Sequence, residues 1–73
     1  MSLERLRQLM QTAKVEQKEL AEELGYSEPS ISRYLSGTRS WPEGFADQAE
    51  AFLLRKAREL MQDLKQTAGV NGR

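Results

Sequence analysis

Apolar residues recur at intervals of three and four along most of this chain, which is the period of one face of an α-helix. The first such set predicts a helix over about 3–13, with Ser2 as its N-cap: it comprises Leu3, Leu6, Met10 and Ala13. No stretch alternates with the period of two that a β-strand requires, and no segment repeats. The pattern therefore predicts an all-α protein.

Two shorter helices are expected next, over about 17–24 and 28–36. Gly25 follows the apolar positions of the first and is suited to a left-handed C-cap. Ser27 is a suitable N-cap for the second, and Pro29 is tolerated in the first helical turn because the N–H it lacks would have no partner there.

A long helix is expected over about 43–67, because apolar residues keep helical spacing there: Phe45, Ala49, Phe52, Leu53, Leu60 and Leu64. This segment is either continuous or broken near residue 55, so four or five helices are possible. Residues 68–73 contain two glycines and an asparagine, which predicts a flexible tail after a domain over 1–67.

Composition narrows the function. The 73 residues include no Cys and no His, which removes thiolate metal sites, the commonest metal ligand and the commonest general base. No nucleophile–base pair or cofactor loop is recognisable, so we expect no enzyme, catalytic residue, cofactor, metal or small-molecule substrate. The N-terminus has no apolar run typical of a signal peptide, and no stretch approaches a membrane span, so a cytoplasmic protein without membrane contact is expected.

Residues 17–36 combine two short helices with a turn containing Gly, which describes a helix-turn-helix. Ala21 lies where the two helices would cross closely, and Gly25 allows the positive φ that a sharp turn needs. The larger apolar residues are spaced to meet beneath the turn: Leu20, Leu24, Tyr26, Ile31 and Tyr34. Lys18, Ser30, Ser32 and Arg33 are then expected to face outward.

This unit resembles the helix-turn-helix of the phage repressor and Cro family, which reads Gln-x-x-Leu-Ala-x-x-Leu-Gly-(apolar)-Ser-x-x-x-Ile-Ser-x-(apolar/aromatic). The match is close over residues 17–36, and the flanking helices agree with the family. The resemblance implies a compact, lambda-repressor-like domain with four or five helices. It also implies a prokaryotic or phage-encoded, nucleoid-associated regulator that lays its third helix in the major groove of double-stranded DNA.

The resemblance implies DNA-contacting residues at three places. The start of the second helix supplies Gln17 and Lys18, and Lys14 adds a modest positive charge nearby. The third helix supplies residues that read bases or contact adjacent phosphates: Ser27, Glu28, Pro29, Ser30, Ser32 and Arg33. The end of that helix and the residues just past it are expected to contact the DNA backbone: Ser36, Thr38 and Arg39.

Two of these roles stay open at this stage. Arg33 suits guanine O6 and N7 but would equally suit a phosphate. Glu28 could accept from cytosine N4, or serve only as a first-turn carboxylate that favours the helix dipole.

The charge and three local features depart from the family pattern. Eleven Lys and Arg balance eleven Asp and Glu, whereas DNA-binding domains are usually basic, so weak non-specific affinity is expected. Glu16 stands where the family often has a capping Ser or Thr, and Pro29 removes a donor from the third helix. Four glutamates crowd the second helix, and the resemblance directs the last two sideways or away from DNA: Glu16, Glu19, Glu22 and Glu23.

The leading hypothesis is a sequence-specific transcriptional regulator of repressor or Cro type. Two alternatives remain: the DNA-binding domain of a larger antitoxin or transposition protein with low sequence preference, or a protein-interaction module that acts through the last helix. The apolar stripe of that helix continues through Leu60, Met61 and Leu64, which favours a homodimer. Folding back onto the first helix as a fifth helix is the other interpretation of this stripe.

Overall fold

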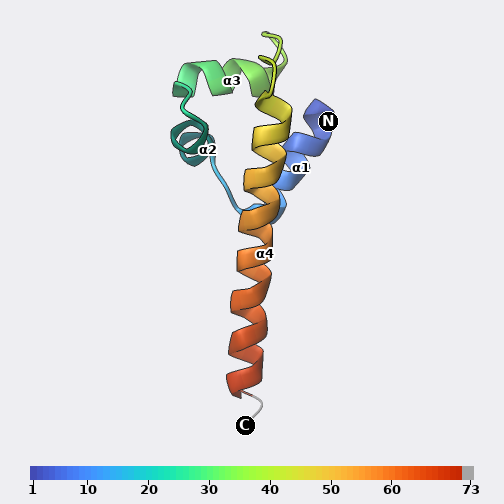
Figure 1. Ribbon diagram of the computed structural model, residues 1–73, viewed down its shortest axis with the longest axis vertical. Coiled ribbons are helices and arrows are strands. Elements are labelled where there is room, and N and C mark those ends of the chain that lie inside the picture. The colour runs from blue at the N-terminus through green and yellow to red at the C-terminus, as the bar shows by residue number, and fades with distance from the viewer. Residues whose placement is uncertain (72–73) are drawn as a thin grey trace.

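Four α-helices follow one another in the computed structural model, which describes the backbone of residues 1–71 and the side chains of residues 1–62. They are α1 (Leu3–Ala13), α2 (Gln17–Leu24), α3 (Glu28–Ser36) and α4 (Phe45–Asn71). α1 lies along α4, while α2 and α3 form a bent pair on the other side and at the end of the same helix (Figure 1). The described part of the chain contains no strand, so the predicted all-α class is confirmed.

The ends of the first three helices are fixed by local capping. The Ser2 hydroxyl accepts a hydrogen bond from the Arg5 amide at 3.1 Å and begins α1. Lys14 is the C-cap of α1 and has a left-handed φ of 57°. The amide of the next residue, Val15, donates to the Met10 carbonyl at 2.9 Å. This 6→1 hydrogen bond closes the last turn of α1. The side chains of the two residues that it joins, Met10 and Val15, are both buried.

The turn between α2 and α3 has the expected chemistry. Gly25 adopts φ 80°, and the amides of Gly25 and Tyr26 both donate to the Ala21 carbonyl, at 2.9 and 3.0 Å. The Ser27 hydroxyl accepts from the Ser30 amide and begins α3. Glu16 makes no side-chain cap for α2, so the start of α2 lacks the capping bond, as the sequence predicted.

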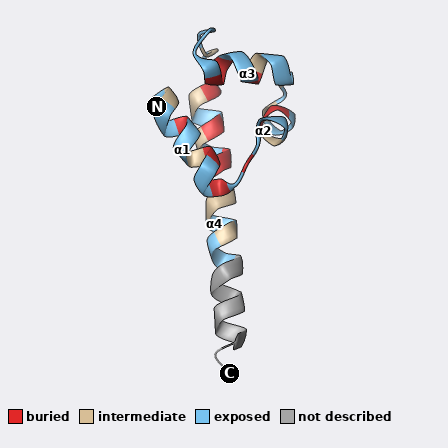
Figure 2. Cartoon of the chain, turned by 180° about the vertical axis from the view of Figure 1, so that it is seen from behind, coloured by how far each residue is buried: buried red, intermediate tan, exposed pale blue. Residues whose placement is uncertain are grey.

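The core lies where the four helices face one another (Figure 2). Phe45 is fully buried at the start of α4, and its ring centroid lies 5.6, 5.1 and 5.3 Å from those of Tyr26, Tyr34 and Trp41. These aromatic contacts join α3 and the loop after it to α4. The other buried residues are Leu6, Met10, Ala13, Val15, Leu20, Ala21, Ile31, Tyr34, Leu35, Ala49, Phe52 and Leu53.

α4 differs from its predicted bounds at both ends. It begins at Phe45 rather than 43, because Gly44 has φ 84° and the Phe45 amide donates to the Pro42 carbonyl in a turn. Of the two alternatives left open near residue 55, the structure shows the continuous one, and no fifth helix follows α4 within the described residues. α4 also includes residues 68–71 of the expected tail, because Gly69 weakens a helix without ending it. Residues 72–73 lie outside the described residues.

Candidate nucleic-acid interface

The exposed side of α3 is polar and narrow. Four of its five exposed residues have the spacing i, i+3, i+4 and i+7 and share one face: Pro29, Ser32, Arg33 and Ser36. The opposite face buries Ile31, Tyr34 and Leu35 in the core. An exposed helix of this width fits the major groove of duplex DNA, which admits a single α-helix.

The first turn of α3 uses hydroxyl groups for its own capping. Ser27 Oγ accepts from the Ser30 amide at 3.3 Å and donates to Ser30 Oγ at 2.9 Å. Ser30 was expected to face outward, but it is half-buried. The structure therefore places Ser27 and Ser30 at the helix start, beside the exposed face rather than on it.

The last turn of α3 is tied to the loop that follows. Hydroxyl groups of Ser36 and Thr38 lie 2.7 Å apart and both donate to the Arg33 carbonyl, at 3.1 and 3.3 Å. The Trp41 indole N–H donates to the Tyr34 carbonyl at 3.1 Å. These bonds hold residues 37–41 against the end of α3 and keep Thr38, with its exposed neighbour Arg39, just beyond the exposed face.

An open groove of about 980 Å³ borders α3 on the side of α1 and the start of α2. It brings together five residues predicted to contact DNA: Gln17, Lys18, Glu28, Ser32 and Ser36. The remaining predicted residues do not line it: Ser27, Pro29, Ser30, Arg33, Thr38 and Arg39.

The groove also contains residues of α1 that the sequence analysis missed. Arg7 and Gln11 line it together with Lys14, and the Arg7 guanidinium donates to the Leu35 carbonyl. Arg7 and Gln11 follow the spacing i, i+4, which places them on one face of α1, and Lys14 continues this spacing at the C-cap. A polar stripe at this spacing was the available signal, although the sequence could not say which element it would face.

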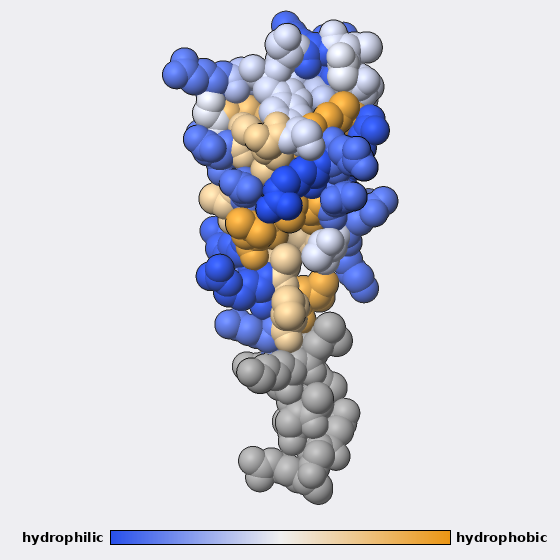
Figure 3. Space-filling model, turned by 90° about the vertical axis from the view of Figure 1, so that its right-hand side faces the viewer, coloured by the Kyte–Doolittle hydropathy of each residue, from blue (hydrophilic) through white to orange (hydrophobic). Residues whose placement is uncertain are grey.

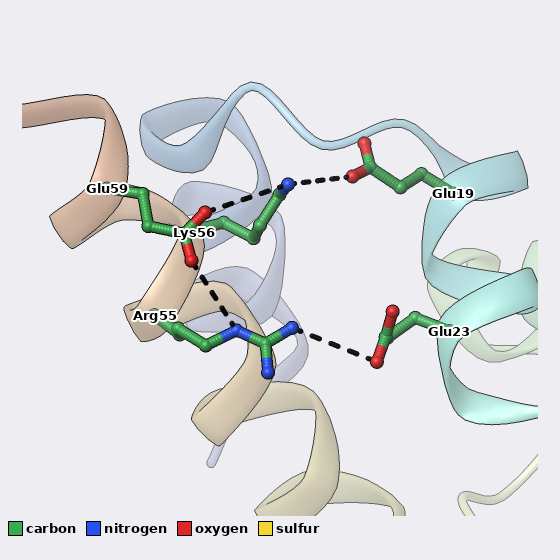
Figure 4. Close-up of polar contacts among 5 residues, drawn as sticks. All are labelled: Glu19, Glu23, Arg55, Lys56 and Glu59. Carbon is green, nitrogen blue, oxygen red and sulfur yellow. Dashed lines mark ion pairs between the residues drawn. The ribbon is translucent and has the colours of Figure 1, made fainter. Parts of the chain in front are cut away.

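Two of the three acidic residues of α2, Glu19 and Glu23, are directed towards α4 rather than towards the groove. Glu19 lies 3.4 Å from Lys56 Nζ, and Glu23 lies 3.8 Å from Arg55 (Figure 4). Both basic residues also approach Glu59, at 3.9 Å. All five side chains are partly exposed, so each pair contributes little to stability, but together they neutralise carboxylates that would otherwise repel DNA.

The basic residues also fall into two groups, those that contact carboxylates and those that do not. Arg5, Arg55 and Lys56 contact carboxylates, with Arg5 3.7 Å from Glu50. Among the side chains described, those of six other basic residues approach no carboxylate within 4.0 Å. Arg58 lies on α4, and the other five lie at or beside the exposed face: Arg7, Lys14, Lys18, Arg33 and Arg39. A chain of zero net charge thus presents unpaired cations on one side.

The described residues include no cluster of three or more potential metal ligands. None of the helices in the described part combines the length and the apolar character needed to cross a bilayer.

Comparison with known families matches residues 4–58 to the helix-turn-helix domain. The matched region runs from the first turn of α1 to the middle of α4 and therefore includes the whole bihelical unit. Because it covers more than half of the chain, the protein belongs to the helix-turn-helix domain family. No curated protein and no solved structure shows significant similarity to the chain.

Proposed function

We propose that this protein binds double-stranded DNA with α3 in the major groove and acts as a small transcriptional regulator of the repressor or Cro type. The observation that supports this most strongly is the narrow polar face of α3, which carries Arg33 and is flanked by unpaired cations of other elements. A regulator of this kind acts at the prokaryotic nucleoid, so we place it in the cytoplasm.

The proposal gives each group a role. Arg33 reads guanine O6 and N7, for which its planar set of N–H donors is suited. The Ser32 hydroxyl can pair with either a donor or an acceptor on a base edge. Gln17 and Lys18 at the start of α2, and Thr38 and Arg39 after α3, contact phosphates on opposite sides of the inserted helix. Phosphate contacts fix the position of α3, and the few polar groups on its face supply the sequence preference.

The test is selection of bound sequences from a random duplex pool, followed by fluorescence anisotropy of the enriched duplex over a series of salt concentrations. We expect an enriched motif and an affinity that falls linearly with salt on a log–log scale. Salt-dependent binding without enrichment would favour the domain of a larger protein with low sequence preference. The absence of binding at every salt concentration would contradict DNA binding and favour a protein-interaction module.

A second candidate property is homodimerisation through the distal part of α4. Met61 is 70% exposed and Leu54 41% exposed, although both are large and apolar. On the face shown in Figure 3, apolar atoms reach the surface among hydrophilic ones down to where the described side chains end. Two copies would present two α3 helices to half-sites about 34 Å apart.

Sedimentation equilibrium tests the dimer. We expect a concentration-dependent dimer that Met61→Glu dissociates, because a charge would be buried in the apolar contact. The change Gln62→Glu adds the same charge to the neighbouring exposed position and serves as the control. A wild-type protein that is monomeric at all concentrations would contradict the dimer and leave DNA binding as a separate question.

A further inference from the structure

We infer that α1 is a second DNA-contacting element: Arg7, Gln11 and Lys14 hold one phosphate backbone strand in the groove beside α3. This inference rests on the proposed function and extends it, because it widens the contact beyond the helix-turn-helix unit. The ligand class is the sugar-phosphate backbone of duplex DNA, recognised without regard to base sequence.

The position of the groove supports this inference. Ser32 and Ser36 belong both to the exposed face of α3 and to one wall of the groove, so the two surfaces are continuous. A helix inserted into the major groove has one phosphate strand along each side, because the groove is only about 12 Å wide. A strand on the α1 side of α3 would therefore pass along this groove.

The groove has the chemistry that a phosphate strand requires. Its floor includes the buried side chains of Met10, Val15 and Leu35, while its rim is polar. Three cations stand on the rim against the two carboxylates of Glu16 and Glu28, and neutral donors lie between them. The cations are Arg7, Lys14 and Lys18, and the neutral donors are Gln11, Gln17, Ser32 and Ser36.

Arg7 is held in place by α3 itself. Its guanidinium donates to the Leu35 carbonyl in the last turn of α3, where the helix dipole favours a positive charge. An arginine has five N–H donors, so this bond leaves others for a phosphate oxygen. Arg7 thus links α1 to α3 and fixes the spacing between these two walls of the groove.

At Lys14, the effect of the side-chain charge can be tested without disturbing the backbone conformation. Lys14 ends α1 with φ 57°, which is the only positive φ of a non-glycine residue among those described. A glycine adopts this conformation without the cost that a side chain incurs and is the usual residue at this helix position. The change Lys14→Gly therefore removes the cation while favouring the native backbone.

The experiment measures the DNA affinity of Lys14→Gly and Arg7→Gln across a salt series, with urea unfolding of each variant alongside. Arg5→Gln is the matched control, because Arg5 lies on the same helix but approaches Glu50 of α4 instead of the groove. We expect Lys14→Gly to unfold at higher urea than the wild type and yet to bind DNA about 5- to 10-fold more weakly near 0.1 M salt. Its salt slope, and that of Arg7→Gln, should fall by about 0.9, while Arg5→Gln retains the wild-type slope.

Unchanged slopes and affinities in both groove variants, with normal binding by the wild type, would overturn this inference alone. A wild type that binds no duplex would overturn the proposed function and this inference together. Equal losses in Arg7→Gln and Arg5→Gln, with none in Lys14→Gly, would also overturn it, because they would report net charge or folding rather than contacts in the groove.

Discussion

The Lys56 ammonium lies 3.4 Å from the Glu19 carboxylate and joins α4 to α2. Together with the contact between Arg55 and Glu23, it turns two acidic groups of α2 towards α4 (Figure 4). Two of the four glutamates that made a neutral chain look poorly suited to DNA, Glu19 and Glu23, are thus paired on the side of α2 that faces α4. The charge of the exposed face, and not the total charge of the chain, is what a phosphate backbone meets.

This division of charge predicts different effects for two substitutions of the same kind. Glu28 is exposed and lines the groove, so Glu28→Gln removes a like charge near phosphate and should raise affinity for random-sequence duplex by up to about fivefold, or about 1 kcal/mol. Glu23→Gln should change that affinity less than about twofold, because Glu23 is paired with Arg55 and faces α4. Fluorescence anisotropy at low salt measures both. Equal effects of the two changes would show that the pairing does not direct the charge away from DNA.

Arg33 should carry sequence preference. It is exposed on α3, so Arg33→Ala should change the free energy of unfolding by no more than about 0.5 kcal/mol. On the selected duplex it should cost about 1–3 kcal/mol of binding free energy and relax the preference for guanine at one position. Competition between the selected duplex and single-base variants measures this. A loss that is the same on every sequence would assign Arg33 to a phosphate instead.

Ala21 should tolerate no larger side chain. It is 2% exposed on α2, which packs against α3, so Ala21→Leu should lower the free energy of unfolding by about 1–3 kcal/mol through overpacking. Ala51→Leu, at an exposed position of α4, is the control and should lie within about 0.5 kcal/mol of the wild type. Urea unfolding followed by circular dichroism measures both. Similar stabilities of the two variants would mean that α2 and α3 are not closely packed at Ala21.

Gly25 should be required for its backbone conformation and not for its size. Its φ is 80°, and a Cβ built there meets no atom within 4 Å. Gly25→Ala should therefore destabilise the fold by about 1–2 kcal/mol through backbone strain alone, and Gly25→Asn by less, because Asn enters the left-handed region more readily. Chemical unfolding of the two variants tests this order. Equal stability of wild type and Gly25→Ala would contradict the left-handed turn.

The first three helices were predictable because their ends are set by residues at those ends. Ser2, Gly25 and Ser27 each act through hydrogen bonds or φ angles within a few positions of themselves. The start of α4 was not predicted, because the turn at Pro42 and Gly44 competes with the helix. Its continuity past residue 55 was left open, because an apolar stripe alone does not show whether a long helix bends back onto its neighbours.

The candidate site was predictable only in part, for a similar reason. The periodicity of α3 identifies its exposed face, since Ile31, Tyr34 and Leu35 define the buried one. The role of Arg7 depends on how closely α1 approaches the end of α3, and the pairing of Glu19 depends on where α4 passes α2. Those are tertiary relationships, which local spacing does not encode.

The most direct test of the central claim is to follow the backbone amide signals of the ¹⁵N-labelled protein while the selected duplex is added. The account predicts that the largest shifts fall at Gln17 and Lys18 and over residues 28–39, with smaller shifts around Lys14 and little change at Glu50, on the α4 side of the molecule. Shifts concentrated on α4, with the signals of α3 unmoved, would contradict the placement of α3 in the major groove.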